Sequence, residues 1–183
     1  MERKNVFVTV GTTHFDALIK AVVDDETLEK LREKGYKEIV LQTGNGKFVP
    51  EQGVHRGVNI TSFRLKASIA EDFAKADLVI SHAGAGSCLE ALEAGKPLVA
   101  VVNDTLMANH QVELAEELAS REFCFFCYPS TLQSTLATLD ISQLKKYEPG
   151  QPQLVADYLD KDTAVSHTFL RDLLASLFEL NES

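Results

Sequence analysis

The stretch 81–97 (SHAGAGSCLEALEAGKP) contains small residues followed by a carboxylate. Their types and spacing are those of one half of a nucleotide-binding site. Backbone N–H groups freed at a helix start, together with the positive end of the helix dipole, bind phosphate. Glu90 lies about one turn into the predicted helix, where its carboxylate can accept hydrogen bonds from paired ribose hydroxyls. The turn that would face the phosphates comprises four small residues, Gly84, Ala85, Gly86 and Ser87.

A structural alternative explains the same residues. Small residues also let a helix pack closely on a sheet, and a glutamate on a helix is most often simply solvated. A lone glycine turn is weak evidence for a nucleotide. The spacing by itself therefore leaves both interpretations open.

The elements that must position this turn follow from the flanking apolar runs at 77–80 and 98–102, which predict a βαβ unit around the central helix. Strands and helices alternate along the rest of the chain with short connections. Further strands are expected at 5–10, 38–42, 58–61 and 123–128. Further helices are expected at 14–34, 67–75, 111–121 and 131–139. The first of these is expected to break near Asp24 and to end at Gly35 as its C-cap, and the second to begin with a capping box of Ser68 and Glu71.

This alternation predicts an α/β fold, a Rossmann-like and mostly parallel sheet covered by helices on both faces. Ligands of such sheets bind beyond the carboxyl ends of the strands, at the switch point. The glycine-rich and polar turns all fall at that edge, in the loops 11–14, 43–47, 62–64, 81–87 and 103–110.

Length and composition narrow the classes of function. The chain has 183 residues, 45% of them hydrophobic and 25% charged, which is typical of a globular protein. A net charge of −9 argues against nucleic-acid or anionic-membrane binding, which need clustered Lys and Arg. We expect no signal peptide, no membrane span and a cytoplasmic location.

The chain is expected to divide into a Rossmann-like nucleotide-binding domain at 1–146 and a C-terminal part at 147–183. Prolines and a glycine in 147–152 (YEPGQP) are typical of a linker. An amphipathic helix is expected at 163–180, with few basic residues on its polar side. This helix is predicted either to dock a partner protein or to cover the chain's own sheet.

Cys124 and Cys127 have the spacing of a metal-binding C-x-x-C pair, but they lie in an apolar run that reads as a strand. Residues i and i+3 of a strand point to opposite faces, and no second cysteine pair completes a zinc site. We expect structural cysteines and no metal.

Four segments together resemble a known family. LQTGNGKF, VNITSF, ADLVISHAGAGSCLEALEAGKPLVAV and NHQVELAEEL are similar, in order and spacing, to the C-terminal half of family 28 glycosyltransferases, which have the GT-B fold. The resemblance covers residues 5–125, and the S-H-x-G-x-G…E…G-K-P stretch is specific to it.

The resemblance implies a donor site drawn from these segments. Glu90 would hold the ribose of UDP-N-acetylglucosamine (UDP-GlcNAc), and the turn at 84–87 would face the diphosphate. Phe63 would cover the uracil, and the backbone of Arg64 would hydrogen-bond to it. The remaining positions would face the donor sugar (His110 and Gln111) or the phosphates and the acceptor (Gly11, Thr12 and Thr13).

It also implies the reaction. A donor-binding subunit would transfer N-acetylglucosamine to dolichyl-diphosphate-GlcNAc, the second step of lipid-linked oligosaccharide synthesis for N-glycosylation. A membrane-anchored partner would hold the acceptor and recruit the chain to the cytosolic face of the endoplasmic reticulum. Residues 5–125, which carry the resemblance, show no D-x-D pair and no catalytic base, so we expect neither a metal nor a cofactor, and the catalytic residue is unknown.

Two departures and several structural alternatives accompany these assignments. The first loop is Gly-Thr-Thr-His rather than glycine-rich, and Val112 follows Gln111 where the family often has Asn. Phe63 has an alternative role as a core aromatic, and His110 and Gln111 as an exposed helix start. For His14 and His82 the alternative is a loop residue satisfied by backbone hydrogen bonds, and neither is assigned a catalytic role.

Two other classes of function stay open at this stage. One is another Rossmann-type nucleotide enzyme, such as a dehydrogenase, against which the absence of G-x-G-x-x-G counts. The other is a non-catalytic module that binds a nucleotide sugar.

Overall fold

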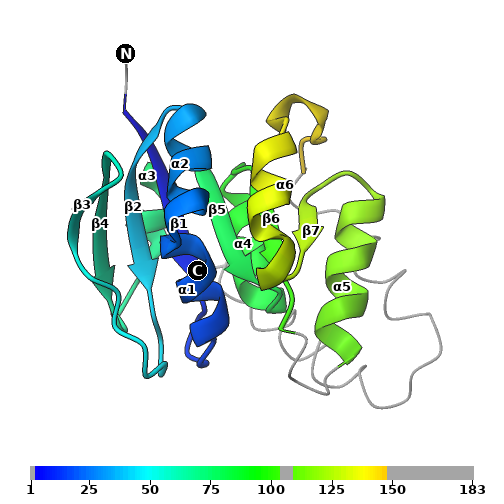
Figure 1. Ribbon diagram of the computed structural model, residues 1–183. Coiled ribbons are helices and arrows are strands. Elements are labelled where there is room, and N and C mark those ends of the chain that lie inside the picture. The colour runs from blue at the N-terminus through cyan, green and yellow to red at the C-terminus, as the bar shows by residue number, and fades with distance from the viewer. Residues whose placement is uncertain (1–2, 104–108, 148–183) are drawn as a thin grey trace. The chain divides into compact units, whose positions relative to one another are not determined.

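The computed structural model describes residues 3–103 and 109–147, which belong to one unit spanning Met1–Tyr147 (Figure 1). Their strands are β1 (Lys4–Thr9), β2 (Tyr36–Gln42), β3 (Gly53–His55), β4 (Val58–Phe63), β5 (Leu78–His82), β6 (Leu98–Val101) and β7 (Phe125–Cys127). Their helices are α1 (Asp16–Val23), α2 (Asp25–Glu33), α3 (Ala70–Lys75), α4 (Ala85–Glu93), α5 (Asn109–Ser120) and α6 (Leu132–Thr138), with short 3₁₀ turns η1 (Pro129–Thr131) and η2 (Ile141–Gln143).

The strands form one sheet in the order β3-β4-β2-β1-β5-β6-β7. Every neighbouring pair is parallel except β3 with β4. The chain begins at β1, builds outward through β2 and β4, and then returns to β5 on the other side of β1. The mostly parallel α/β sheet is therefore confirmed, and its switch point lies between β1 and β5.

Helices cover both faces of this sheet, with α1, α2 and α6 in front and α3 and α4 behind (Figure 1). Side chains of β1 point alternately to the two faces of the sheet, so this strand contributes to the core on both sides. Val6 and Val8 join the core under α1, α2 and α6. Phe7 points to the other face, where its ring meets Phe73 of α3 edge-on at 5.1 Å. Both sides of β1 are therefore buried, as expected for a central parallel strand.

The predicted break near Asp24 is confirmed. Asp24 has an extended backbone, ends α1, and caps α2 by accepting a 3.1 Å hydrogen bond from the N–H of Glu26. Gly35, with φ +89°, terminates α2 as a left-handed residue should.

The segment at 47–57, where no strand is predicted, contains the edge strand β3. β3 and β4 are joined by a two-residue turn in which Arg56 and Gly57 both have positive φ, 51° and 81°. An X-Gly turn of this kind is a hairpin signal. The strand is three residues long and has no alternating apolar pattern, so the turn is its main signature.

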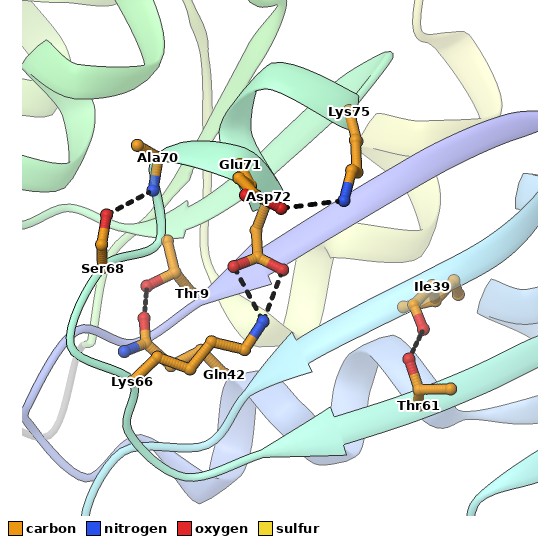
Figure 2. Close-up of polar contacts among 10 residues, drawn as sticks. All are labelled: Thr9, Ile39, Gln42, Thr61, Lys66, Ser68, Ala70, Glu71, Asp72 and Lys75. Carbon is orange, nitrogen blue, oxygen red and sulfur yellow. Dashed lines mark hydrogen bonds and ion pairs between the residues drawn. The ribbon is translucent and has the colours of Figure 1, made fainter.

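The predicted capping box at Ser68 and Glu71 is wrong. α3 begins later, at Ala70, and the Ser68 hydroxyl accepts a 3.3 Å hydrogen bond from the N–H of Ala70 (Figure 2). Glu71 does not reach back to the helix start, because its carboxylate pairs with Lys75 one turn along at 3.1 Å.

Cys124 and Cys127 lie in different surroundings. Cys127 joins the core shared with α6, whereas the Cys124 thiol lies 4.0 Å from the carbonyl oxygen of Ala115 in α5. Burial raises the pKa of Cys124 to about 12 and that of Cys127 to about 11, so both are neutral thiols at pH 7. Cys124 lies one residue before β7, outside the strand, so the argument that the two cysteines point to opposite faces of one strand does not apply. The absence of a bound metal stays a prediction.

Tyr147 is 8% exposed and packs edge-on against Phe123 at 5.7 Å, so the described domain extends through this residue. The rest of the predicted linker and the helix expected at 163–180 lie outside the described residues. Among the helices that are described, none has the length and apolarity needed to cross a membrane.

Candidate nucleotide site

The predicted loops gather at one edge of the sheet. Because β1, β2, β4, β5 and β6 are mutually parallel, the residues that follow their carboxyl ends all lie along that edge. The loops after β1, β2, β4 and β5 are described in full. The loop after β6 is described only as far as Asn103.

Asn45 ties the loop after β2 to the loop after β1. Its backbone N–H donates to the carbonyl oxygen of Thr13 at 2.8 Å, and its side-chain amide donates to the carbonyl oxygen of Thr12 at 2.7 Å. Gly44 permits this approach: its φ is +55°, and a Cβ there would lie 2.3 Å from the oxygen of Thr13. The Thr12–Thr13 backbone is thereby held in one conformation.

Asp16 fixes the same loop from its other end. Its carboxylate accepts hydrogen bonds from the N–H groups of Lys47, at 3.1 Å to each oxygen, and of Phe48, at 3.2 Å. Sequence reasoning placed Asn45 in a turn and assigned nothing to Asp16. The available signals were an Asn between two glycines and an acidic residue at a helix start, both of which are common.

The loop after β4 joins this assembly through main-chain bonds. Thr43 N–H donates to the carbonyl of Phe63 at 2.9 Å, and Gly44 N–H donates to the carbonyl of Arg64 at 3.1 Å. The Arg64 guanidinium donates to the carbonyl of Gly46 at 3.3 Å. Arg64 therefore helps to hold the loop, and its own N–H has no acceptor among the described residues.

Phe63 is half-buried, and its ring has two neighbours. Phe7 stacks parallel to it at 6.5 Å, and the Lys66 ammonium lies 3.9 Å from its centroid. Figure 2 shows Lys66 paired in turn with Asp72, at 2.8 Å. The alternative of a core aromatic thus holds in part, since the ring belongs to an aromatic stack that ends at the site's edge.

His82 joins the loop after β1 to the turn before α4. Its Nδ1 lies 3.4 Å from the carbonyl oxygen of Thr9. A Cβ on Gly11 would lie 2.9 Å from this ring, and a Cβ on Gly84 would lie 2.2 Å from its Nε2. Gly11 and Gly84 are therefore required by the packing of His82. Burial lowers the pKa of His82, with a small opposing contribution from the Thr9 carbonyl, so it is neutral at pH 7.

The start of α4 has the properties of an anion site. Gly84 occupies the N-cap position with an extended backbone, and no side chain of the described residues caps this helix. Among the described residues, no atom outside the helix's own backbone lies within 4 Å of the position where a Cβ on Gly86 would be. Glycine inside a helix costs up to about 1 kcal/mol relative to alanine, and no packing contact of the described residues requires it here. The space beside Gly86 is open to a ligand.

Glu90 follows Gly86 by one turn, so the two share a face of α4. The residue is exposed, its carboxyl group is partly desolvated, and no described residue forms a hydrogen bond or ion pair with that group. Partial burial, and then the charge of Glu93, raise the pKa of Glu90. An unpaired, partly desolvated carboxylate near a helix start suits a pair of hydroxyl groups.

The remaining predicted residues are only partly placed. Ala85 and Ser87 lie in the first turn of α4 and are partly buried. His110 and Gln111 lie in the first turn of α5, after the undescribed segment, and Gln111 is partly buried. Within the described ranges we identify no catalytic base, and no group of three His, Cys, Asp or Glu side chains suits a metal.

Comparisons with known proteins agree with this geometry. The sequence profile of the glycosyltransferase family 28 C-terminal domain matches residues 5–161. The chain is 53% identical over 124 residues to UDP-N-acetylglucosamine transferase subunit ALG13 of Homo sapiens, a match that covers 68% of this chain and 11% of that protein. It is 33% identical to the subunit of the same name from Saccharomyces cerevisiae, over 81% of this chain and 89% of that protein.

A solution NMR structure of ALG13 has the same fold, with a TM-score of 0.62 and 26% identity, over 79% of this chain and 89% of that one. The chain thus spans a small part of the human relative and most of the yeast relative. A match along most of the chain and a shared fold lead to one conclusion: this chain belongs to the glycosyltransferase family 28 C-terminal domain family.

Proposed function

We propose that this domain is the donor-binding part of a UDP-GlcNAc transferase. The observation that carries the proposal is the start of α4, where the described residues supply no side-chain cap, leave space beside Gly86 and form no ion pair or hydrogen bond with the Glu90 carboxylate one turn along. The helix start would bind the diphosphate without a metal. Glu90 would accept hydrogen bonds from the ribose, and the Phe63–Arg64 segment would receive the base.

The reaction proposed is displacement of UDP from the anomeric carbon of N-acetylglucosamine by a sugar hydroxyl of dolichyl-diphosphate-GlcNAc. The bond to the leaving diphosphate breaks as the new glycosidic bond forms, and the hydroxyl proton passes to a base. Fixed N–H dipoles at α4 would stabilise the charge that develops on UDP. His110 and Gln111 would reach the donor sugar.

A second chain would complete the active site. The relatives named above are called subunits, which supports a complex. The proposed partner is anchored in the endoplasmic reticulum membrane, holds the lipid-linked acceptor, and recruits this domain to the cytosolic face. Residues 147–183 are proposed to contribute to that contact.

The test has two stages. Calorimetric titration of the isolated chain with UDP-GlcNAc, NADH and ATP should give heat only with UDP-GlcNAc; binding of NADH or ATP alone would support another nucleotide enzyme. Transferase activity should then appear when the chain is combined with membranes that contain the partner. UDP-GlcNAc binding with no activity in any such combination would support a non-catalytic binding module.

A further inference from the structure

A row of side chains crosses the sheet just below the candidate site. The row runs from Ser81 on β5 through Thr9 on β1 and Gln42 on β2 to Phe63 on β4, and each residue is the register partner of the next. All four lie on the face of the sheet that α3 and α4 cover. Ser81 and Thr9 are 0% exposed and Gln42 is 4% exposed. Central strands of parallel sheets are normally apolar on both faces, so three buried polar side chains in one row need partners.

Gln42 is the member of the row whose donors are unused. The Ser81 hydroxyl donates to the carbonyl of His82 at 2.8 Å. The Thr9 hydroxyl donates to the amide oxygen of Gln42 at 2.5 Å (Figure 2) and accepts from the N–H of Gly11 at 3.0 Å. The amide nitrogen of Gln42 donates to no described residue. Although Gln42 as a whole is buried, this nitrogen is not one of the fully buried side-chain atoms that lack a partner, so it keeps contact with solvent. Its N–H groups are therefore free to donate to a ligand.

The position of Gln42 selects which part of a nucleotide it meets. Neighbouring strands lie about 4.8 Å apart. Gln42 is one strand from Phe63, the residue proposed to cover the base. It is two strands, or about 10 Å, from β5, which leads into the helix proposed to bind the diphosphate. The amide is therefore closer to the base.

We infer that Gln42 reads the pyrimidine base of the donor, by donating from its amide nitrogen to the carbonyl oxygen at position 4 of uracil. This inference rests on the proposed function and deepens it. The Thr9 hydroxyl occupies the amide oxygen of Gln42, so the group presents its NH₂ rather than its oxygen. Uracil offers an acceptor at position 4, and cytosine offers an amino donor there. Gln42 is thus a specificity-determining residue, and Thr9 is a positioning residue that fixes the orientation of its amide.

The test compares UDP with CDP by calorimetric titration. Gln42→Met keeps the side chain's length and removes the donor, so UDP affinity should fall about tenfold while CDP affinity stays nearly constant. Gln42→Glu replaces the donor with an acceptor of almost the same shape and should shift the preference toward CDP. The control is Gln143→Met, the same change in η2. The segment after α6 that contains η2 lies at the end of the sheet where the strands begin, away from the candidate site (Figure 1), so this change should alter neither affinity.

Thr9→Val gives a readout that a merely structural role of Gln42 does not predict. Without the hydroxyl the amide can turn over, so CDP affinity should rise relative to UDP affinity. Equal losses for UDP and CDP in both Gln42 variants, or unchanged UDP binding, would overturn the inference while leaving the proposed function intact. Failure of the unaltered chain to bind UDP at all would overturn both.

Discussion

The Nδ1 of His82 lies 3.4 Å from the carbonyl oxygen of Thr9, joining the ends of β5 and β1 across the switch point of the sheet. The ring fills the space between the two loops that would carry the diphosphate, and two glycines accommodate it. Burial of this imidazole connects the stability of the site to pH.

Stability should fall as the solution is made acidic. Burial lowers the folded-state pKa of His82 below the ordinary value of 6.5. The unfolded chain therefore binds the proton more readily, so the stability that neutral His82 contributes is present above pH 6.5 and is lost as the pH falls through its folded-state pKa. Urea unfolding between pH 7.5 and pH 5 should show this loss, and His82→Asn should reduce the loss. His14→Asn, in an exposed position of the neighbouring loop, should keep the original pH dependence.

Gly86→Ala should separate folding from binding. A methyl group there meets no atom of the described residues outside the helix's own backbone within 4 Å, and alanine favours helix, so the free energy of unfolding should stay constant or rise by up to about 1 kcal/mol. The same methyl group would occupy the space proposed for the diphosphate. UDP affinity should fall roughly 2- to 30-fold, the range for an anion at a helix start. A variant that is destabilised, or that binds UDP normally, would contradict the assignment.

Glu90→Gln should weaken nucleotide binding and relieve an electrostatic cost in the free protein. Loss of charge-assisted hydrogen bonds to the ribose should lower UDP affinity about 10- to 150-fold. The pKa of Glu90 is raised in the folded chain, so the contribution of this one group to stability is greatest below pH 4.5 and is lost as the pH rises through its folded-state pKa. Removing the carboxylate should therefore stabilise the free chain at pH 7. The matched control is Glu93→Gln, which should bind UDP normally. Equal effects of the two changes on affinity would refute a specific role for Glu90.

Much of this arrangement could be predicted because it follows from local pattern. Apolar runs separated by helical segments imply parallel strands, and parallel strands place their following loops at one edge, which located Gly11–Thr13, Phe63–Arg64 and the turn at 84–87 together. The contacts that hold these loops were not predictable. Asn45 meets Thr12 and Thr13, and Asp16 meets Lys47 and Phe48, across some 30 residues of chain.

The other differences between the sequence-based predictions and the structure depend on which side chains are buried. Gln42 reads as an ordinary residue at a strand end, and only its 4% exposure and unused amide nitrogen single it out. Phe63 was assigned to the uracil, and its ring also has Phe7 and Lys66 as neighbours. These neighbours come from β1 and from the loop after β4, and a local pattern does not show that they converge on one ring.

Gly44→Ala should be the most damaging single change in the loops. At φ +55° an alanine is strained by about 1–2 kcal/mol, and its Cβ would also lie 2.3 Å from the carbonyl oxygen of Thr13 and 2.8 Å from that of Gly11. Backbone atoms cannot yield as a flexible side chain does, so the loop after β1 must move, and UDP affinity should fall together with stability. Gly95→Ala is the matched control: its φ of +66° imposes the same strain, but no atom of residues 3–103 and 109–147 other than its chain neighbours lies within 4 Å of the position where its Cβ would be. Urea unfolding and UDP titration should show a loss of about 1–2 kcal/mol with unchanged affinity at position 95, and a larger loss in both measurements at position 44. Equal destabilisation by the two changes, with UDP binding retained in both, would mean that the loop after β1 takes no part in holding the nucleotide.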